Sequence, residues 1–95
     1  MRIRYTPQAL TDLESISAYY RAISPRVASA IVSEIERRIA QLSRLPLIAP
    51  QTDEPGIREL IVLRYPYKIY YRIDDRIVVI MHLRDARRRP WRSNP

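Results

Sequence analysis

Composition and charge narrow the functions open to this chain of 95 residues, which carries a formal net charge of +7. It contains no cysteine and one histidine, which excludes a disulfide scaffold and argues against a thiolate or histidine-rich metal site. No run of about 18 apolar residues and no signal-peptide pattern is present, so we expect a cytoplasmic protein. Sixteen of the 17 basic residues are arginine, and this predicts an acidic partner, either a nucleic acid or an acidic protein segment.

The first half of the sequence predicts one strand followed by two helices. Arg2–Tyr5 alternates polar and apolar residues, which is typical of a short strand. Thr6-Pro7 and Ser24-Pro25 each place a hydroxyl N-cap before a proline, which is a helix-start signal. We expect helices over residues 7–22 and 25–45, joined so closely that they form an antiparallel hairpin. The first helix has an apolar face of Ala9, Leu13, Ile16 and Tyr20, with Asp12 and Glu14 near its N-terminal end, and the second has a stripe of Val27, Ile31, Ile35, Ile39 and Leu42.

The last third, from Pro55 to Trp91, contains three strand-like runs joined at Tyr65-Pro66 and at Asp74-Asp75. Aspartate is a good turn residue, so Asp74-Asp75 is interpreted as a hairpin turn rather than a pair of metal ligands. A two-residue period assigns an apolar parity to Ile57, Ile61, Leu63, Tyr67, Ile69, Tyr71, Ile73, Ile77, Val79, Met81 and Leu83. The opposite parity carries Arg58, Arg64, Lys68, Arg72, His82 and Arg84.

This order of elements predicts an α+β fold of the form β-α-α-β-β-β, with the helical hairpin packed on one face of a small antiparallel sheet. We expect the opposite, arginine-bearing face to stay open. Residues 1–95 are expected to form a single domain in which residues 85–95 are a basic C-terminal tail.

The basic face and tail are the first candidate site, because arginines mixed with aromatic residues suit phosphate contact and base stacking. The alternative is that exposed strand positions are charged only for solubility. His82 could act as a general acid or base, although the tail offers only Asp85 as an acidic partner, and a lone histidine often only hydrogen-bonds. The candidate target-binding residues are Arg58, Arg64, Lys68, Arg72, His82, Arg84, Arg87, Arg88, Arg89 and Trp91.

The helical hairpin is the second candidate surface. Tyr19 and Tyr20 are adjacent in the sequence and so cannot both face the sheet, which places one of them near a groove or at an edge. The sequence has no Ser-His-Asp signature, no glycine-rich phosphate loop and no CxxC pair, so we expect neither a cofactor nor a metal.

Five segments in this order resemble the RelE/ParE superfamily of toxins from type II toxin–antitoxin modules. They are TPQALTDLESISAYY, IAQLSRLP, PGIRELIV, PYKIYYRIDD and HLRDARRRPW, and they cover most of the chain. The resemblance is strongest to the ParE branch. It implies a growth-inhibiting, plasmid- or chromosome-stabilising toxin that poisons DNA gyrase without catalytic residues. It also implies a ParD-like antitoxin that wraps around the toxin, here over Leu13, Ile16, Tyr19, Tyr20, Ile31 and Ile35. The chain itself is not expected to bind specific DNA sequences, which is the role of the antitoxin.

The RelE branch, whose members cleave mRNA on the ribosome, is the alternative. Aligned on PYKIYY, the chain has Glu59 and Ile61 where RelE carries its sheet lysines, Lys68 in place of an arginine, Arg84 near a late arginine, and Trp91 in place of a tyrosine. Phosphate stabilisation would be weak without the lysine pair, so an endoribonuclease is the second hypothesis. A toxin-like binding module without toxicity is the third.

Overall fold

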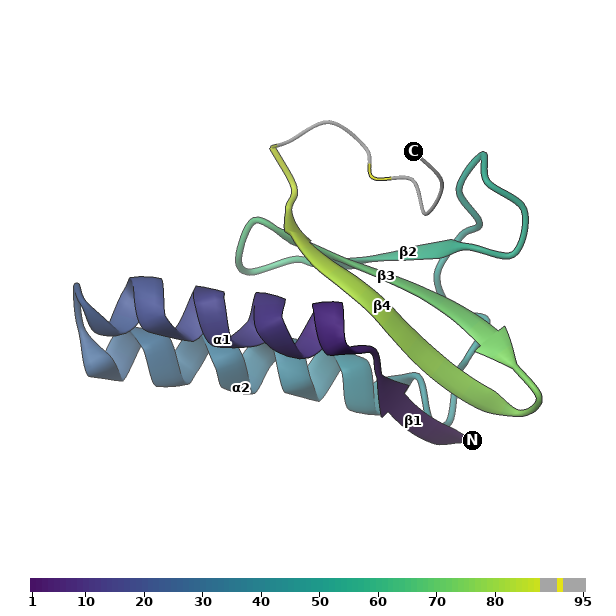
Figure 1. Ribbon diagram of the computed structural model, residues 1–95, viewed down its shortest axis with the longest axis horizontal. Helices are drawn as coiled ribbons and strands as arrows, with labels where there is room; N and C mark the ends of the chain where they lie inside the picture. Colours follow the sequence, from purple (N-terminus) through teal and green to yellow (C-terminus); the bar gives the residue numbers. More distant parts are fainter. Residues whose placement is uncertain (88–90, 92–95) are drawn as a thin grey trace.

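The computed structural model describes residues 1–87 and 91, and it confirms the predicted order of elements (Figure 1). Helices α1 and α2 lie side by side as a hairpin, and the sheet crosses one end of them. None of the helices in this described part is long and apolar enough to cross a bilayer. The elements are β1 (Arg2–Tyr5), α1 (Pro7–Arg21), α2 (Pro25–Gln41), β2 (Arg58–Val62), β3 (Tyr67–Asp74) and β4 (Ile77–Asp85).

Both helices begin where the N-cap signals predict. The Thr6 hydroxyl oxygen accepts the Ala9 N–H at 3.1 Å, and the Ser24 hydroxyl oxygen accepts the Val27 N–H at 3.3 Å. The Thr6 hydroxyl also donates to the Met81 carbonyl at 2.9 Å. This second bond ties the start of α1 to β4, so the capping residue also fixes where the helix leaves the sheet.

The sheet is mixed rather than purely antiparallel as predicted. Its strand order is β1-β4-β3-β2, in which β2, β3 and β4 form an antiparallel meander and β1 pairs with β4 in parallel. A parallel neighbour requires a long crossover connection, and the helical hairpin with the first two meander strands supplies it. Pairing β1 with the last strand places the start of the chain against its end.

A bulge in β4 changes which of its side chains meet the helices. Tyr70 pairs with His82 and Tyr71 with Ile80, so Met81 is an extra residue on β4. Because of this residue, the helix-facing side chains are Val78, Ile80 and Leu83, which join the core cluster, and His82 and Arg84 face the other way. The two-residue period predicted that Ile77, Val79, Met81 and Leu83 all face the core. This prediction is confirmed for Leu83 and is wrong for the other three.

The predicted parity of β2 is also wrong by one residue. Leu60 and Val62 are buried against the helices, whereas Ile61 and Leu63 are 47% and 86% exposed. The run Leu60-Ile61-Val62-Leu63 is apolar at both parities, so the period alone cannot choose a face. Pairing of Leu60 with Ile69 and of Val62 with Tyr67 sets the observed register.

The core lies between α2 and the helix-facing side of the sheet. Ile31 and Ile35 are at most 2% exposed and pack in the same cluster as Ile69, Tyr71 and Ile80. The two isoleucines were predicted to bind an antitoxin, and this is corrected here because a side chain buried under the sheet offers no surface to a partner. Leu13, Ile16 and Tyr20 of α1 are only partly buried against the cluster and remain available.

An acidic side chain of α1 holds the helix on the edge of β4. Strand β1 ends at the pair of Tyr5 with Ile80, so among the described residues β4 has no strand neighbour on that side beyond Ile80. There the Asp12 carboxylate accepts a hydrogen bond from the Leu83 N–H at 2.9 Å and also contacts the ring Nδ1 of His82. Asp12 thus supplies the acceptor for a backbone N–H of β4 at the point where β1 no longer pairs with the strand.

We predict that Asp12→Ala destabilises the fold by about 1–3 kcal/mol, because the partly buried Leu83 N–H loses its acceptor. Asp12→Asn keeps an amide oxygen at that position, so its loss should be smaller. Urea unfolding followed by circular dichroism measures both, with Glu14→Ala on the exposed side of α1 as the control. Equal stabilities for Asp12→Ala and Glu14→Ala would show that the Asp12 contact does not anchor the helix.

Candidate functional site

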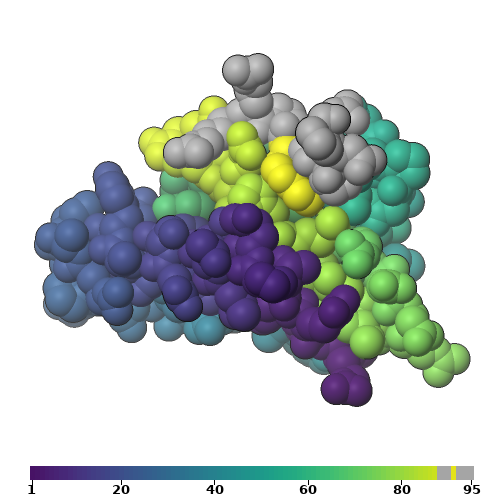
Figure 2. Space-filling view, viewed as in Figure 1, coloured from purple at the N-terminus to yellow at the C-terminus, as the bar shows by residue number. Residues whose placement is uncertain are grey.

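A groove of about 440 Å³ runs between α1 and the C-terminal half of β4, where β1 no longer covers the strand edge. Figure 2 shows α1 across the viewed face, with the end of β4 above it. The groove is lined by Asp12, Ser15, Ile16, Tyr19, Tyr20, Tyr67, His82, Leu83, Arg84, Asp85 and Arg87. Apolar and aromatic side chains therefore line the same concave surface as charged side chains, which include the ion pair of Arg87 with Asp85.

Two adjacent tyrosines of α1 take different places at the groove. Tyr20 packs toward the core, and its hydroxyl accepts a hydrogen bond from the Tyr67 hydroxyl at 3.3 Å. Burial, together with this bond, raises the pKa of Tyr67. Tyr19 is 65% exposed at the rim and meets the Tyr20 ring edge-on at 5.0 Å. The helix therefore presents an exposed aromatic ring beside a partly buried one, which is a suitable anchor for a partner.

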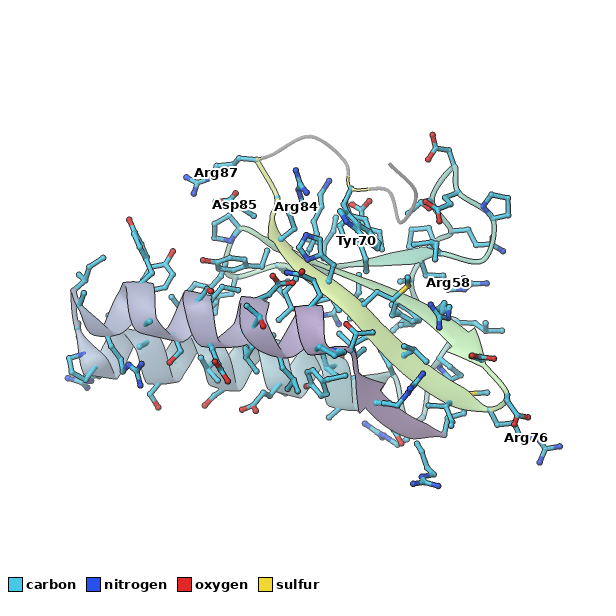
Figure 3. All side chains as sticks on the ribbon, viewed as in Figure 1. Arg58, Tyr70, Arg76, Arg84, Asp85 and Arg87 are labelled. Carbon is cyan, nitrogen blue, oxygen red and sulfur yellow. The ribbon has the colours of Figure 1, made fainter. Side chains whose placement is uncertain are left out.

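The charged end of the groove lies where β4 ends (Figure 3). Arg87 donates to both oxygens of Asp85, from Nε at 3.0 Å and from Nη2 at 2.7 Å. This pairing raises the pKa of the Arg87 guanidinium. The Nε of Arg84 is buried and has no hydrogen-bond partner within the part of the chain that the structure describes. A carboxylate entering the groove would therefore meet two guanidinium groups, of which Arg87 is already paired with Asp85.

Trp91 covers part of the sheet face that points away from the helices, which we call the helix-free face. Its ring centroid lies 5.3 Å from that of Tyr70 and 5.1 Å from that of His82, and its backbone N–H donates to the Tyr70 hydroxyl at 3.3 Å. Tyr70 is fully buried. The expectation that this whole face stays open is therefore wrong at Tyr70, because a tryptophan from the tail lies on it.

The sequence did not predict that Asp12 contacts His82 in the groove. Asp12 stands 70 positions before His82, and the tail had offered only Asp85 as an acidic partner. One signal was present: Asp12 falls between Ala9 and Ile16 at helical spacing, on the sheet-facing side of α1. The contacts Asp12–His82, His82–Trp91 and Trp91–Tyr70 form a continuous path from the groove to the helix-free face.

The other predicted basic residues are not all brought together. Lys68 lies on the helix-free face and forms an ion pair with Glu59 at 3.0 Å, and this hydrogen bond raises the Lys68 pKa. Arg72, on the same face, lies 3.9 Å from Asp74.

Two predicted arginines lie elsewhere. Arg58 is on the helix-facing parity, opposite Tyr71, and its Nη1 donates to the Ala49 carbonyl at 2.6 Å, so it braces a loop and the prediction for it is corrected. The pKa of the Glu34 carboxyl is lowered chiefly by its hydrogen bond from Arg37, and Arg64, in the turn after β2, is close enough to add to this effect. Arg88 and Arg89 lie outside the described residues.

Within residues 1–87 and 91, no three His, Asp or Glu side chains are grouped to hold a metal ion. The hairpin predicted at Asp74-Asp75 is present, but its turn lies one residue further on: Asp74 ends β3, and Asp75 and Arg76 have φ values of 49° and 62°, which suit a tight hairpin turn. The site can therefore offer an aromatic groove, an Asp–His pair and several guanidinium groups, and these chemistries suit a peptide or a polyanion.

Comparison with known proteins places this geometry in one family. The chain is 35% identical over 83 residues to the protein named Putative toxin Y4kP of Sinorhizobium fredii, covering 85% of this chain and 86% of that protein. It superimposes on the chromosomal ParDE toxin–antitoxin system from P. aeruginosa with a TM-score of 0.74 and 25% identity, over 90% of this chain and 95% of that chain. The intact E. coli RelBE toxin–antitoxin complex shares the fold, with a TM-score of 0.71 at 13% identity over 92% of this chain and 98% of that chain.

The family model described as the ParE toxin of the type II toxin–antitoxin system parDE matches residues 3–90, which include both helices, all of β2, β3 and β4, β1 except Arg2, and every residue that lines the groove. The chain therefore belongs to the ParE toxin family of type II toxin–antitoxin systems.

Proposed function

We propose that this protein is a toxin that inhibits DNA gyrase in the cytoplasm, arrests replication, and is neutralised by a ParD-like antitoxin. The observation that carries the proposal is the ParE-family match over residues 3–90. The proposed action is binding without catalysis and needs no cofactor. The target-facing surface is the end of β4 with the arginine-rich tail: Arg84 and Arg87 line the groove there, and Trp91 packs on His82 of the same strand.

The groove beside α1 is the proposed antitoxin site. Its apolar wall includes Ile16, Tyr19 and Tyr20, and its far end carries Arg84 and Arg87. An amphipathic segment with acidic residues at one end matches both features, because its apolar side chains would cover the rings and its carboxylates would meet the guanidinium groups. Leu13 is partly buried on the same helix and would contribute at the margin.

The sheet face supports a gyrase inhibitor over a RelE-type nuclease. Glu59 and Ile61, which stand where RelE carries its sheet lysines, lie on the same face as Lys68. Glu59 pairs with Lys68 at 3.0 Å, so the one lysine of the chain is partly neutralised by a carboxylate. A phosphodiester reacting there would face one paired cation and an exposed isoleucine, which offer little stabilisation to a developing negative charge.

One observation favours the second candidate, an endoribonuclease. The Asp12 carboxylate orients the His82 ring, and both side chains line the groove together with Arg84. An oriented imidazole next to a guanidinium is an arrangement that can move a proton and stabilise a phosphate. The same contacts also suit a structural role, because Asp12 binds the β4 backbone as well as the ring.

Induction of the chain in bacteria without an antitoxin, followed by pulse labelling, should stop DNA synthesis before protein synthesis. Reversing the charge of the tail with Arg87→Glu, Arg88→Glu and Arg89→Glu should abolish this arrest, because the tail is the proposed gyrase contact. The matched control reverses Arg21, Arg26 and Arg44, three exposed arginines outside the groove by the end of β4. An early stop in translation with cleaved mRNA, or a folded tail variant with full toxicity, would overturn the proposal.

His82→Asn tests the nuclease directly, because asparagine keeps an N–H near the Nδ1 position for Asp12 and removes Nε2. We expect growth inhibition to remain within about threefold of the parent, since gyrase binding needs no proton transfer. The readout is the inducer concentration that halves growth, with the thermal midpoint as a check on folding. A loss of about 100-fold or more in a folded variant would shift the assignment to the nuclease.

Tyr19→Glu should weaken neutralisation by the antitoxin from the same operon and leave the toxicity of the free chain intact. Tyr19 is an exposed aromatic at the groove, and truncating such an anchor commonly costs about 2 kcal/mol or more of binding free energy. Ile23→Glu is the control, since Ile23 is similarly exposed at 66% but lies at the hairpin tip outside the groove. Equal neutralisation of both variants would place the antitoxin elsewhere.

A further inference from the structure

Four arginines lie at the end of the helix-free face near the β3–β4 turn. Together they form a surface to which the proposed function gives no role. Arg2 and Arg4 project from β1 away from the core, because Ile3 and Tyr5 occupy the core-facing positions. Arg72 projects from β3, and Arg76 extends from the β3–β4 turn (Figure 3). We call Arg2, Arg4, Arg72 and Arg76 the arginine face.

The register places two of these arginines in one row across the sheet. Arg4 of β1 and Arg72 of β3 both pair with Val79, the residue of β4 that lies between them. The two backbones are therefore two strand spacings apart, or about 10 Å. Arg2 pairs with Ile77 one row further along, so the charges form an array rather than a single point.

Charge is divided unevenly between the two sides of the molecule. The helical hairpin, residues 7–41, carries four basic and four acidic side chains and is neutral as a whole. Helix-free positions of the strands carry five basic side chains against two acidic ones: Arg2, Arg4, Lys68, Arg72 and Arg84, with Glu59 and Asp74. Arg72 lies 3.9 Å from Asp74, and both are well exposed, so this pair costs the face little of its charge.

The arginine face has the chemistry of a backbone contact and lacks that of a peptide or single-strand site. None of its four residues lines any of the grooves described in residues 1–87 and 91, so it offers no cleft for an apolar peptide side chain. The strand residues between them are Ile77, Val79 and Met81, none of which is aromatic, whereas sequence-tolerant single-strand binding depends on stacking rings. Trp91 lies further along β4, over His82 and Tyr70.

We infer that the arginine face binds the phosphate backbone of double-stranded DNA directly and without sequence preference. The inference goes beyond the proposed function, because it requires neither gyrase nor an antitoxin. It implies that the toxin holds DNA as well as protein when it acts on a DNA-bound target. Each arginine that contacts a phosphate releases counterions, so binding must weaken steeply with salt.

Fluorescence anisotropy of the purified chain with a labelled 20-base-pair duplex of mixed sequence tests this, at salt concentrations from 50 to 200 mM. Four phosphate contacts predict a slope of log affinity against log salt of about −3.6. Arg4→Glu with Arg72→Glu should lower the affinity about tenfold or more and reduce the slope by about 1.8. The matched control, Arg26→Glu with Arg44→Glu, makes the same change in net charge away from the arginine face and should lower affinity far less.

Arg4→Gln with Arg72→Gln serves where the reversed variant does not fold, and it should reduce the slope by the same amount. Equal losses in the arginine-face variant and the control would show that net charge alone drives binding, and would overturn the inference. Tighter binding of a single-stranded 20-nucleotide RNA than of the duplex would overturn the assignment to DNA. No duplex binding by the parent chain at 50 mM salt, with gyrase inhibition intact, would overturn this inference and leave the proposed function standing.

Discussion

A single extra residue in β4, Met81, decides which side chains meet the helices and which face away from them. Before the bulge, Val78 and Ile80 point into the core, and after it Leu83 does so. If the strand had continued without the bulge, His82 and Arg84 would share the parity of Val78 and Ile80 and point beneath the helices. Burying an unpaired guanidinium there would cost several kcal/mol, so the bulge is what allows an apolar strand to carry the polar groups of the site.

The bulge also explains how α1 and Trp91 come to be linked by side-chain contacts through His82. With His82 turned outward at a strand edge that β1 has left uncovered, its ring meets Asp12 on one side and Trp91 on the other. Asp12 also binds the Leu83 backbone, so one carboxylate secures the helix, the strand and the imidazole. A partner that fills the groove touches His82 and Arg84 and therefore reaches the contacts that hold Trp91 on Tyr70. If an antitoxin binds in the groove as proposed, its binding would be coupled to the position of Trp91 through these direct contacts.

Local signals in the sequence predicted local structure well. The N-caps at Thr6 and Ser24 marked both helix starts, and the Asp74-Asp75 turn and the strand Arg2–Tyr5 were identified by their patterns. Features that depend on pairing between distant segments were missed. The apolar run at Leu60–Leu63 fits either face, a bulge has no signature in a strand as apolar as β4, and Asp12 lies 70 residues from its partner. Arg2 and Arg4 joined the basic face only because β1 pairs with the last strand in parallel.

Separation of the groove from the arginine face limits how an antitoxin can neutralise the protein. Arg84, the groove cation that acidic groups would meet, pairs with Lys68, and Lys68 lies four residues, or about 13 Å, along β3 from Arg72. At physiological salt the Debye length is about 8 Å, so acidic groups bound in the groove would screen the charge of Arg4 and Arg72 only weakly. A segment confined to the groove would therefore leave the arginine face able to attract DNA. Under the proposed function, neutralisation would then act by excluding gyrase from the end of β4, or by a second antitoxin segment that crosses the helix-free face.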